Sequence, residues 1–206
     1  MRPLSMPLIP CVALLIAAPL TFADKKSESK FEVGPAASYP SKQTSDNVTI
    51  AAVPYDTDDL AHTAFGKVNP YQSGVLPVLV IIQNDTQAAI RMDNVKVEYV
   101  SLDGSRIEAT PALDVRFVGP GPKRPQPNTG SPIPPGLIKH KKPLAAWEIE
   151  GRAFAARMLP PHESASGFFY FQTRHQPGAK LYLAGLHEAS SGKEILYFEI
   201  PLTKDR

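Results

Sequence analysis

The side chains that could carry chemistry are spread along the chain. Each of the five histidines stands alone, with neither an H-x-x-x-H nor an H-x-H spacing. A zinc site needs converging ligands, so these histidines would have to be brought together from distant loops. We therefore predict no metal site, no catalytic constellation and no cofactor. The five are His62, His140, His162, His175 and His187.

Two serines follow a histidine and a glutamate in the stretch from His162 to Ser166. Such neighbours could suggest a proton relay, but side chains so close in an extended turn point in different directions. In addition, no serine has the G-x-S-x-G flanks of a nucleophile elbow. We interpret this stretch as a polar turn before a buried strand.

Three aspartates cluster at Asp56, Asp58 and Asp59. They could bind calcium, although the loop lacks the glycine and the spaced glutamate of an EF-hand. A simpler interpretation is that they lie at the start of a helix, where a carboxylate caps the chain and suits the positive end of the helix dipole.

Residues 119–143 form a long stretch rich in proline and glycine, with basic side chains near both ends. Loops of this length inside a domain are uncommon and are usually functional or disordered. The basic residues could meet an anionic polymer, a lipid headgroup or an acidic partner, and the prolines favour a polyproline II shape that partners can read. A solvated loop and a rigid spacer are the alternatives. The candidate binding residues here are Lys123, Arg124, Lys139, His140, Lys141 and Lys142.

The first 23 residues have the pattern of a secretory leader. Arg2 gives a positive start, Leu8–Leu20 is apolar, and Thr21 and Ala23 place small residues before the polar Asp24. The apolar run is shorter than the roughly 20 residues of a membrane-spanning helix. We predict cleavage near Ala23 and export to the periplasm or cell envelope, with no integral membrane span in the mature chain; a leader retained as an anchor is the alternative.

Cys11 is the only cysteine and lies within this leader. A lipoprotein would be acylated at such a cysteine, but the preceding Leu8-Ile9-Pro10 lacks the expected small residues. Cleavage near Ala23 would leave a mature chain without a thiol, which could form no disulfide. The chain has 206 residues with 22 Lys and Arg against 20 Asp and Glu. This near balance argues against a nucleic-acid binder.

Turn signals divide the rest of the chain into short segments, because its 22 prolines are excluded from helix interiors and central strands. Residues 24–46 are polar and are expected to be flexible, and residues 47–206 are expected to form a single domain. One short helix is predicted at about Asp58–Phe65, ended by Gly66. Strands or hairpins are predicted over 47–53, 75–83, 95–109, 113–118 (or a helical turn after Pro111), 166–173 and 180–202.

This rhythm predicts an all-β fold, an antiparallel sandwich of seven to eight strands with one short helix and the long Pro-rich loop. The proline-rich turn at Leu159–Pro161 that leads into the aromatic strand Gly167–Phe171, and the apolar strand Val78–Asn84, resemble immunoglobulin-like domains of exported bacterial proteins. The resemblance implies an immunoglobulin-like sandwich and brings no catalytic residues. Within the aromatic strand, Phe169 and Phe171 are expected on the outer face, either under the long loop or as an apolar contact patch.

Together these features predict an exported, non-enzymatic binding or structural module of the bacterial cell envelope. We expect it to contact an envelope protein or an anionic polymer through residues 119–143 and the adjacent strand, or through an open sheet edge. One alternative is an envelope hydrolase that brings histidines and carboxylates together from loops. Another is a periplasmic chaperone or assembly factor with an exposed edge strand.

Overall fold

The computed structural model describes residues 31–119, 144 and 147–203. In these residues the chain is mostly β, with twelve strands in three antiparallel sheets and few helical turns. The strands are β1 (Lys42–Ser45), β2 (Val48–Pro54), β3 (Leu76–Asn84), β4 (Ile90–Arg91), β5 (Lys96–Val100), β6 (Arg106–Glu108), β7 (Met158–Leu159), β8 (Ser164–Phe171), β9 (Lys180–Ala184), β10 (Leu186–Glu188), β11 (Glu194–Ile195) and β12 (Phe198–Pro201). The helices are α1 (Asp58–Phe65), α2 (Ala112–Val115) and α3 (Trp147–Gly151), with 3-10 turns η1 (Ala36–Ser38) and η2 (Tyr71–Ser73).

The predicted all-β class is confirmed, but two of its details are wrong. The strands outnumber the seven to eight expected, in part because each arm of the final hairpin is divided in two, as β9 and β10 and as β11 and β12. The helix predicted over Asp58–Phe65 is present as α1, yet α2 and α3 add two more short helices. Residues 113–118, one of the predicted strands, follow the alternative and turn helically after Pro111.

The first sheet, in the order β1-β2-β3-β8, has its most apolar strand in the middle. In β3, Ile82 pairs with Ile50 of β2 on one side, and Val78 pairs with Phe169 of β8 on the other. Both faces of this sheet are covered, which explains why β2 and β3 read as nearly continuous apolar runs rather than as alternating ones.

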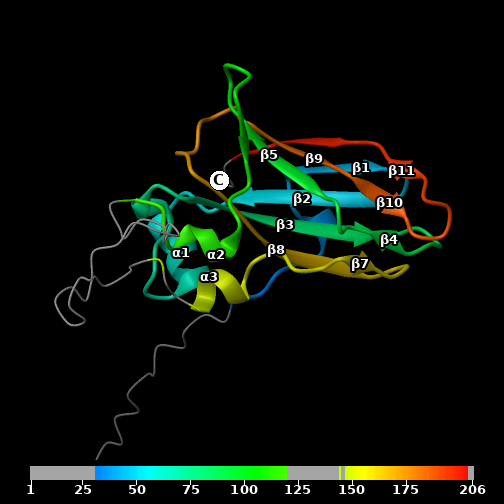
Figure 1. The fold of residues 1–206 in the computed structure, drawn as a ribbon, viewed down its shortest axis with the longest axis horizontal. Helices are drawn as coiled ribbons and strands as arrows, with labels where there is room; N and C mark the ends of the chain where they lie inside the picture. The colour runs from blue at the N-terminus through cyan, green and yellow to red at the C-terminus, as the bar shows by residue number, and fades with distance from the viewer. Residues whose placement is uncertain (1–30, 120–143, 145–146, 204–206) are drawn as a thin grey trace, which may run out of the picture.

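The other two sheets, β11-β10-β4-β7 and β12-β9-β5-β6, continue into one another as a second layer. Leu183 pairs with Phe198 and Leu186 pairs with Ile195, which is the register of one unbroken hairpin. The hairpin predicted over 180–202 is therefore confirmed, with a bend at Gly185 where φ is +86°. The two layers run side by side in Figure 1, with β5 and β9 crossing over β2 and β3.

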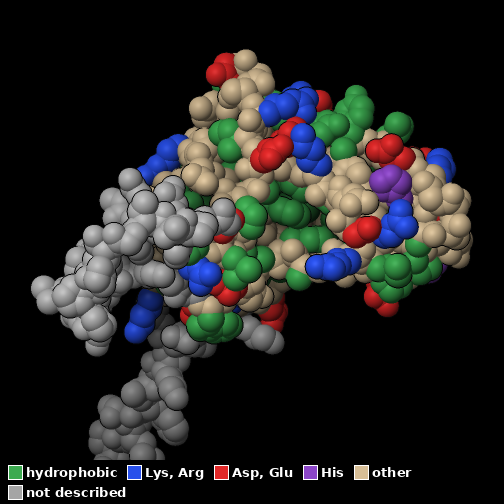
Figure 2. All heavy atoms as spheres, in the orientation of Figure 1, with side chains coloured by type: hydrophobic (Ala, Val, Ile, Leu, Met, Phe, Trp, Pro, Cys, Tyr) green, Lys and Arg blue, Asp and Glu red, His purple; other side chains and the backbone are tan. Residues whose placement is uncertain are grey.

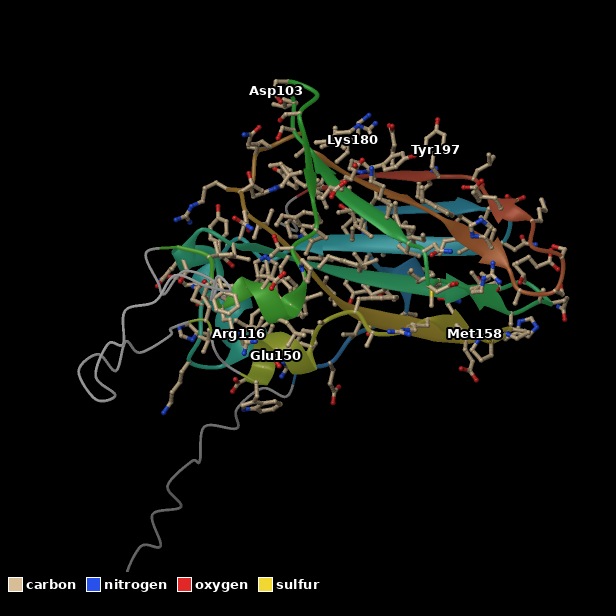
Figure 3. The ribbon with its side chains drawn as sticks, viewed as in Figure 1. Asp103, Arg116, Glu150, Met158, Lys180 and Tyr197 are labelled. Atoms are coloured by element: carbon tan, nitrogen blue, oxygen red, sulfur yellow. The ribbon has the colours of Figure 1, made fainter. Side chains whose placement is uncertain are left out.

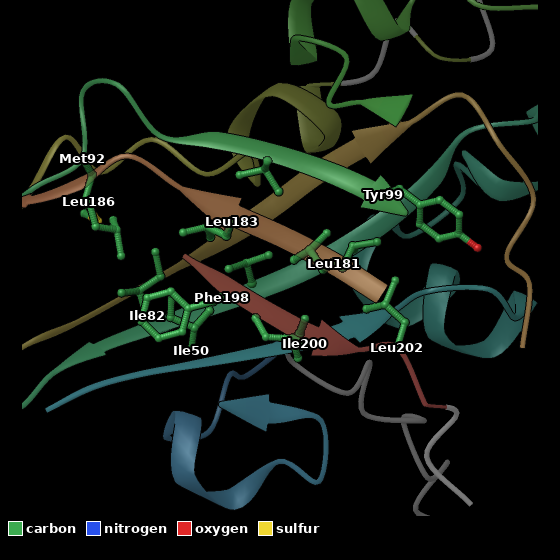
Figure 4. Close-up of a cluster of buried hydrophobic side chains, with 14 of the residues drawn as sticks. Ile50, Ile82, Met92, Tyr99, Leu181, Leu183, Leu186, Phe198, Ile200 and Leu202 are labelled. Carbon is green, nitrogen blue, oxygen red and sulfur yellow. The ribbon is translucent and has the colours of Figure 1, made fainter. Parts of the chain in front are cut away.

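The main core lies between the two layers. Figure 4 shows Ile50 and Ile82 of the first sheet facing Leu181, Leu183 and other apolar side chains of the second layer. At least 20 side chains in this cluster are almost fully buried, and the hydrophobic effect acting on them holds the layers together.

A second core covers the opposite face of the first sheet. Phe168 and Tyr170 of β8 point away from the main core and pack with Phe65 of α1 at ring-centroid distances of 4.8 and 6.3 Å. The Tyr170 hydroxyl donates a hydrogen bond to the carbonyl oxygen of Ile149 at 2.6 Å and so fixes α3. Burial raises the pKa of this hydroxyl, which keeps it a donor.

Part of the segment expected to be flexible belongs to the fold, which corrects the predicted domain start at residue 47. Lys42–Ser45 pairs with β2, and Ala36 is fully buried. Asp46 and Asn47, with φ of 49° and 57°, form the two-residue turn of the β1–β2 hairpin. The hairpin was missed because β1 consists of polar residues at the margin of the sheet.

The two sides of this layered structure differ. On one side β1 lies against β12, where the Glu199 amide donates to Gln43 Oε1 at 2.8 Å and the Thr203 amide donates to Ser41 Oγ at 3.2 Å. On the other side β8 and β6 are the outer strands, and the layers are bridged there by Thr110, whose amide donates to the Tyr170 carbonyl at 2.7 Å. This side, which we call the open side because two cavities lie on it, carries the candidate site.

Candidate functional site

Two adjoining cavities lie along β8 on the open side of the layers. The first, which we call the slot, has a volume of about 340 Å³ and lies between β5 and β8. The second, the outer cavity, has a volume of about 440 Å³, and the two share Ala109, Thr110 and Pro111 as a common wall. In Figure 2 hydrophobic side chains are visible in the hollow between β5 and β8, near the centre of the view.

The slot exists because the chain crosses between layers at Ala109 and Thr110. The Ala109 amide still donates to Val97 in the second layer at 3.1 Å, while the Thr110 amide donates to Tyr170 in the first sheet at 2.7 Å. Pro111 follows and cannot donate to a ladder. The chain that begins as β6 therefore turns away from β5 after Ala109, close to the N-terminal end of β5.

Aromatic rings line the slot on the side of the first sheet. Phe169 of β8 and Phe154 stack at a centroid distance of 5.2 Å with 20° between their planes. The segment carrying Phe154 is held tightly against β8, since the Phe154 amide donates to the Phe168 carbonyl at 3.1 Å. This close approach requires Gly167, as a Cβ there would lie 2.4 Å from the Cα of Phe154.

Two charged residues that line the slot, Lys96 and Glu108, belong to a group of paired charges at its rim that extends to Glu98 and Arg106. Lys96 Nζ lies 2.7 Å from Glu98 Oε1 and 3.6 Å from Glu108 Oε1, and Arg106 Nη1 lies 2.8 Å from Glu98 Oε2. Hydrogen bonds from Lys96 and Arg106 hold the pKa of the Glu98 carboxyl below its usual value. The rim thus presents both signs of charge and no net excess.

This charged group continues over the outward face of β9 and β12. Arg106 lies over the ring of Tyr182 at 4.6 Å, and Tyr182 stacks on Tyr197 at 5.6 Å. Figure 3 shows Tyr197 and Lys180 pointing away from the core on this face. The alternation predicted for β5 is confirmed for its inward residues, but Glu98 is 4% exposed because these neighbours cover it.

Replacing Glu98 by glutamine should reduce stability at neutral pH by about 1 kcal/mol, because two charge-assisted hydrogen bonds are weakened. A carboxyl with a lowered pKa in the folded state stabilises the fold above its unfolded pKa, near 4.5, and this contribution is lost as pH falls through the folded value. Urea unfolding at about pH 7 and about pH 3 should therefore show a smaller loss on acidification in Glu98→Gln than in the wild type. Glu108→Gln, at a position that is 75% exposed, is the control and should behave like the wild type. Equal acid sensitivity of wild type and Glu98→Gln would contradict this assignment.

The predicted contact residues have different outcomes. Phe169 is half-buried and lines the slot. Phe171 is fully buried in the main core, 6.0 Å from the ring of Tyr99, so the expectation that it lies on an outer patch is wrong. Both faces of β8 are covered, one by α1 and α3 and the other by the second layer. The basic candidates Lys123, Arg124, Lys139, His140, Lys141 and Lys142 lie outside the described residues.

The described end of the Pro-rich stretch does lie beside β8. Gly119 lines the outer cavity together with Gln172, which directly follows β8. The rest of this stretch, residues 120–143, lies outside the described residues.

Among residues 31–119, 144 and 147–203, no three histidine, cysteine or acidic side chains are grouped as a metal ion would require. The described histidines are separate: His62 Nδ1 bonds to the Gly66 carbonyl at 2.6 Å, whereas His187 Nδ1 lies 3.1 Å from the Gly185 carbonyl. His175 lies beside Tyr99, 6.3 Å between ring centroids, and lines a separate cavity of about 310 Å³ with Asp56. Asp58 does not line this cavity. Its Oδ1 accepts a hydrogen bond from Asn69 Nδ2 at 2.7 Å, which is consistent with its place at the start of α1.

Sequence reasoning missed Val95–Val97, Thr110 and Phe154 as parts of a site. The one available signal was Gly167, since a glycine inside an aromatic strand indicates that another backbone approaches closely. Which segment approaches depends on tertiary packing, so the glycine alone does not identify Phe154.

No protein-family model matches the chain, and no curated protein matches it. A solved structure of a functionally unknown protein from Listeria monocytogenes EGD-e aligns over 80% of this chain and 82% of its own, with 9% identity and a TM-score of 0.34. In the described part of the chain, no helix has both the length and the apolar character needed to cross a bilayer.

Proposed function

We propose that this protein is an exported, non-enzymatic binding module of the bacterial cell envelope, built as an immunoglobulin-like variant of the β-sandwich. It contacts a protein partner through the slot, the outer cavity and the stretch 119–143 that begins beside them. Export rests on the leader pattern of residues 1–23. The resemblance to immunoglobulin-like domains rests on the turn at Leu159–Pro161 and the strand that follows it.

The observation that carries this proposal is the continuous surface along β8. Phe169 in the slot, Thr110 on the shared wall, and Gln172 and Gly119 in the outer cavity lie next to one another. Cavities of about 300 to 1,000 Å³ with an apolar lining and a few polar groups are typical of binding sites. The charged residues at the rim pair with each other, which favours recognition over acid–base chemistry.

The rim also favours a protein over an anionic polymer. Lys96 and Arg106 are matched by Glu98 and Glu108, so this group of charges has no basic excess to attract phosphate or carboxylate groups.

Site-specific photocrosslinking tests the proposal. A benzoylphenylalanine placed at the exposed Gln172 should give one reproducible protein adduct in cells of the source organism, recovered in the envelope fraction. The same group at Tyr197, which is 53% exposed and immediately precedes β12, is the matched control and should give at most a tenth of that yield. Equal adducts at both positions, no adduct at Gln172, or an adduct confined to the cytoplasm would overturn the proposal.

A further inference from the structure

Another cavity, which we call the end cavity, lies at the end of the layers opposite the helices, where β4, β10 and β11 come together (Figure 1). Its volume of about 300 Å³ is at the lower end of the range of about 300 to 1,000 Å³ that is typical of small-molecule sites. Its walls come from the β1–β2 turn, the loop 86–88 and the β10–β11 hairpin. Ile90 and Ile195 also line it, and because both belong to the main core, the cavity has an apolar floor.

Hydrogen bonds hold the three walls of the end cavity together. The Asp85 amide donates to the Asn47 carbonyl at 2.9 Å and so ties the loop to the β1–β2 turn. The Ala189 amide donates to the Ala89 carbonyl at 2.8 Å and ties the loop to the β10–β11 hairpin. The fully buried side chain of Asn84 bonds to the loop itself. The cavity is therefore preformed, and a ligand that enters it orders little of the chain.

Three charged side chains line the end cavity, and their charged groups are not hydrogen-bonded to one another. Lys193 Nζ lies 4.0 Å from Asp46 Oδ1, which is beyond hydrogen-bond distance. Among the described residues, neither of these two groups has another polar partner. The Glu188 carboxylate accepts from the hydroxyls of Ser190 and Ser191 at 2.7 and 2.8 Å, and these bonds hold the pKa of Glu188 below its usual value. A carboxylate has about four acceptor sites, so Glu188 can still accept from a ligand.

We infer that the end cavity binds a free amino acid with an apolar side chain. Lys193 pairs with the carboxylate of the ligand, while Asp46 and Glu188 accept hydrogen bonds from its ammonium group. The side chain of the ligand lies on Ile90 and Ile195, where the burial of apolar surface adds to the affinity. This site is separate from the slot, so the inference goes beyond the proposed function and does not rest on it.

The lining of the end cavity argues against other classes of ligand. A purely apolar ligand would cover three charged groups without giving them partners, which is unfavourable. A phosphate group would meet two carboxylates beside a single lysine. In the part of the chain that the structure describes, no three metal-ligating side chains are grouped here or elsewhere. A small molecule with both charges and an apolar stem satisfies the whole lining, and a free amino acid has this combination.

Nuclear magnetic resonance on the purified chain tests this inference, with L-leucine as the probe. We expect saturable shifts at the amides of Ala88, Lys193 and Ile195, all of which line the cavity. Three related compounds are the ligand controls: N-acetyl-L-leucine lacks the ammonium group, L-leucinamide lacks the carboxylate, and glycine lacks the apolar side chain. Each should bind at least about tenfold more weakly, because either a charge-assisted hydrogen bond or the burial of the side chain is lost.

Two substitutions test the charged groups without touching the core. Lys193→Met keeps the aliphatic stem, removes the charge and should weaken the binding of L-leucine at least about tenfold. Lys180→Met is the matched control, since Lys180 is also exposed but does not line the cavity, and it should leave binding unchanged. Asp46→Asn should weaken binding as well. Asparagine tolerates the φ of 49° at this position, so the β1–β2 turn is retained.

The ligand controls also identify the other possible occupants. Equal binding of L-leucinamide and L-leucine would point to the amino terminus of a peptide, equal binding of N-acetyl-L-leucine would point to a carboxyl terminus, and either result would overturn the inference. The absence of shifts at the lining amides, or an unchanged affinity in Lys193→Met, would overturn it too. None of these outcomes affects the photocrosslink at Gln172, which tests a different surface.

Discussion

Replacing Gly167 by alanine should lower the free energy of unfolding by about 3 kcal/mol, one of the two largest effects that we expect from a single substitution. The added methyl carbon would lie 2.4 Å from the Cα and 2.6 Å from the amide nitrogen of Phe154. Both are backbone atoms, so no side-chain rotation relieves the overlap. Either β8 or the segment 152–154 must move, and the hydrogen bonds that join them at Phe168 would be strained or broken.

Urea unfolding followed by circular dichroism measures this change. Ser166→Ala, at the exposed neighbouring position of β8, is the control and should shift stability by less than about 0.5 kcal/mol. Trp147, the single tryptophan of the chain, lies in α3 close to the displaced segment, so its fluorescence should change in Gly167→Ala even where the far-ultraviolet spectrum does not. Wild-type stability of Gly167→Ala would show that the segment does not lie where we place it.

Replacing Asn84 by alanine should also lower the free energy of unfolding by about 3 kcal/mol. Here the cause is the loss of buried hydrogen bonds and not a steric overlap. The fully buried Asn84 side chain donates from Nδ2 to the carbonyls of Ala88, Leu159 and Pro160, and its Oδ1 accepts from Thr86. These bonds join the ends of β3 and β7 where the chain passes from one layer to the other. Alanine would leave carbonyl groups buried without their donor.

The comparison with Gln83 isolates this effect. Gln83→Ala removes an adjacent amide that donates to the exposed carboxylate of Asp85, and it should lower the free energy of unfolding by less than about 0.5 kcal/mol. Thermal unfolding of the two variants alongside the wild type provides the measurement. Similar melting temperatures for Asn84→Ala and Gln83→Ala would mean that the buried amide does not connect the layers.

Local sequence signals predicted the elements whose stability is local. Thr57 accepts a hydrogen bond from the Leu60 amide at 3.4 Å and Gly66 ends α1, in agreement with the expected helix bounds. The Asp103-Gly104 turn and the alternating residues before it predicted the β5–β6 hairpin correctly, because a tight turn fixes the register of its two strands.

Features that depend on tertiary packing were not predictable in this way. Asn84 ends β3, as the strand Val78–Asn84 predicted, but its full burial could not be predicted, because two of its partners, the carbonyls of Leu159 and Pro160, lie about 75 residues further along the chain. Phe171 was placed on the outside since an aromatic strand usually has one exposed face, and only the layer on each side of β8 decides otherwise. The slot is a gap left where β6 departs from β5, and such a gap has no residue pattern of its own.

The seam between β1 and β12 has a consequence for the order in which the chain folds. Ser41 and Thr203 are bonded across 162 positions of sequence, and β12 supplies Phe198 and Ile200 to the main core. Contacts of such long range form late, since the loop between them must close first. A nascent polypeptide that has released only its first 190 residues still lacks this last strand, so its apolar interior stays open to water until synthesis is complete.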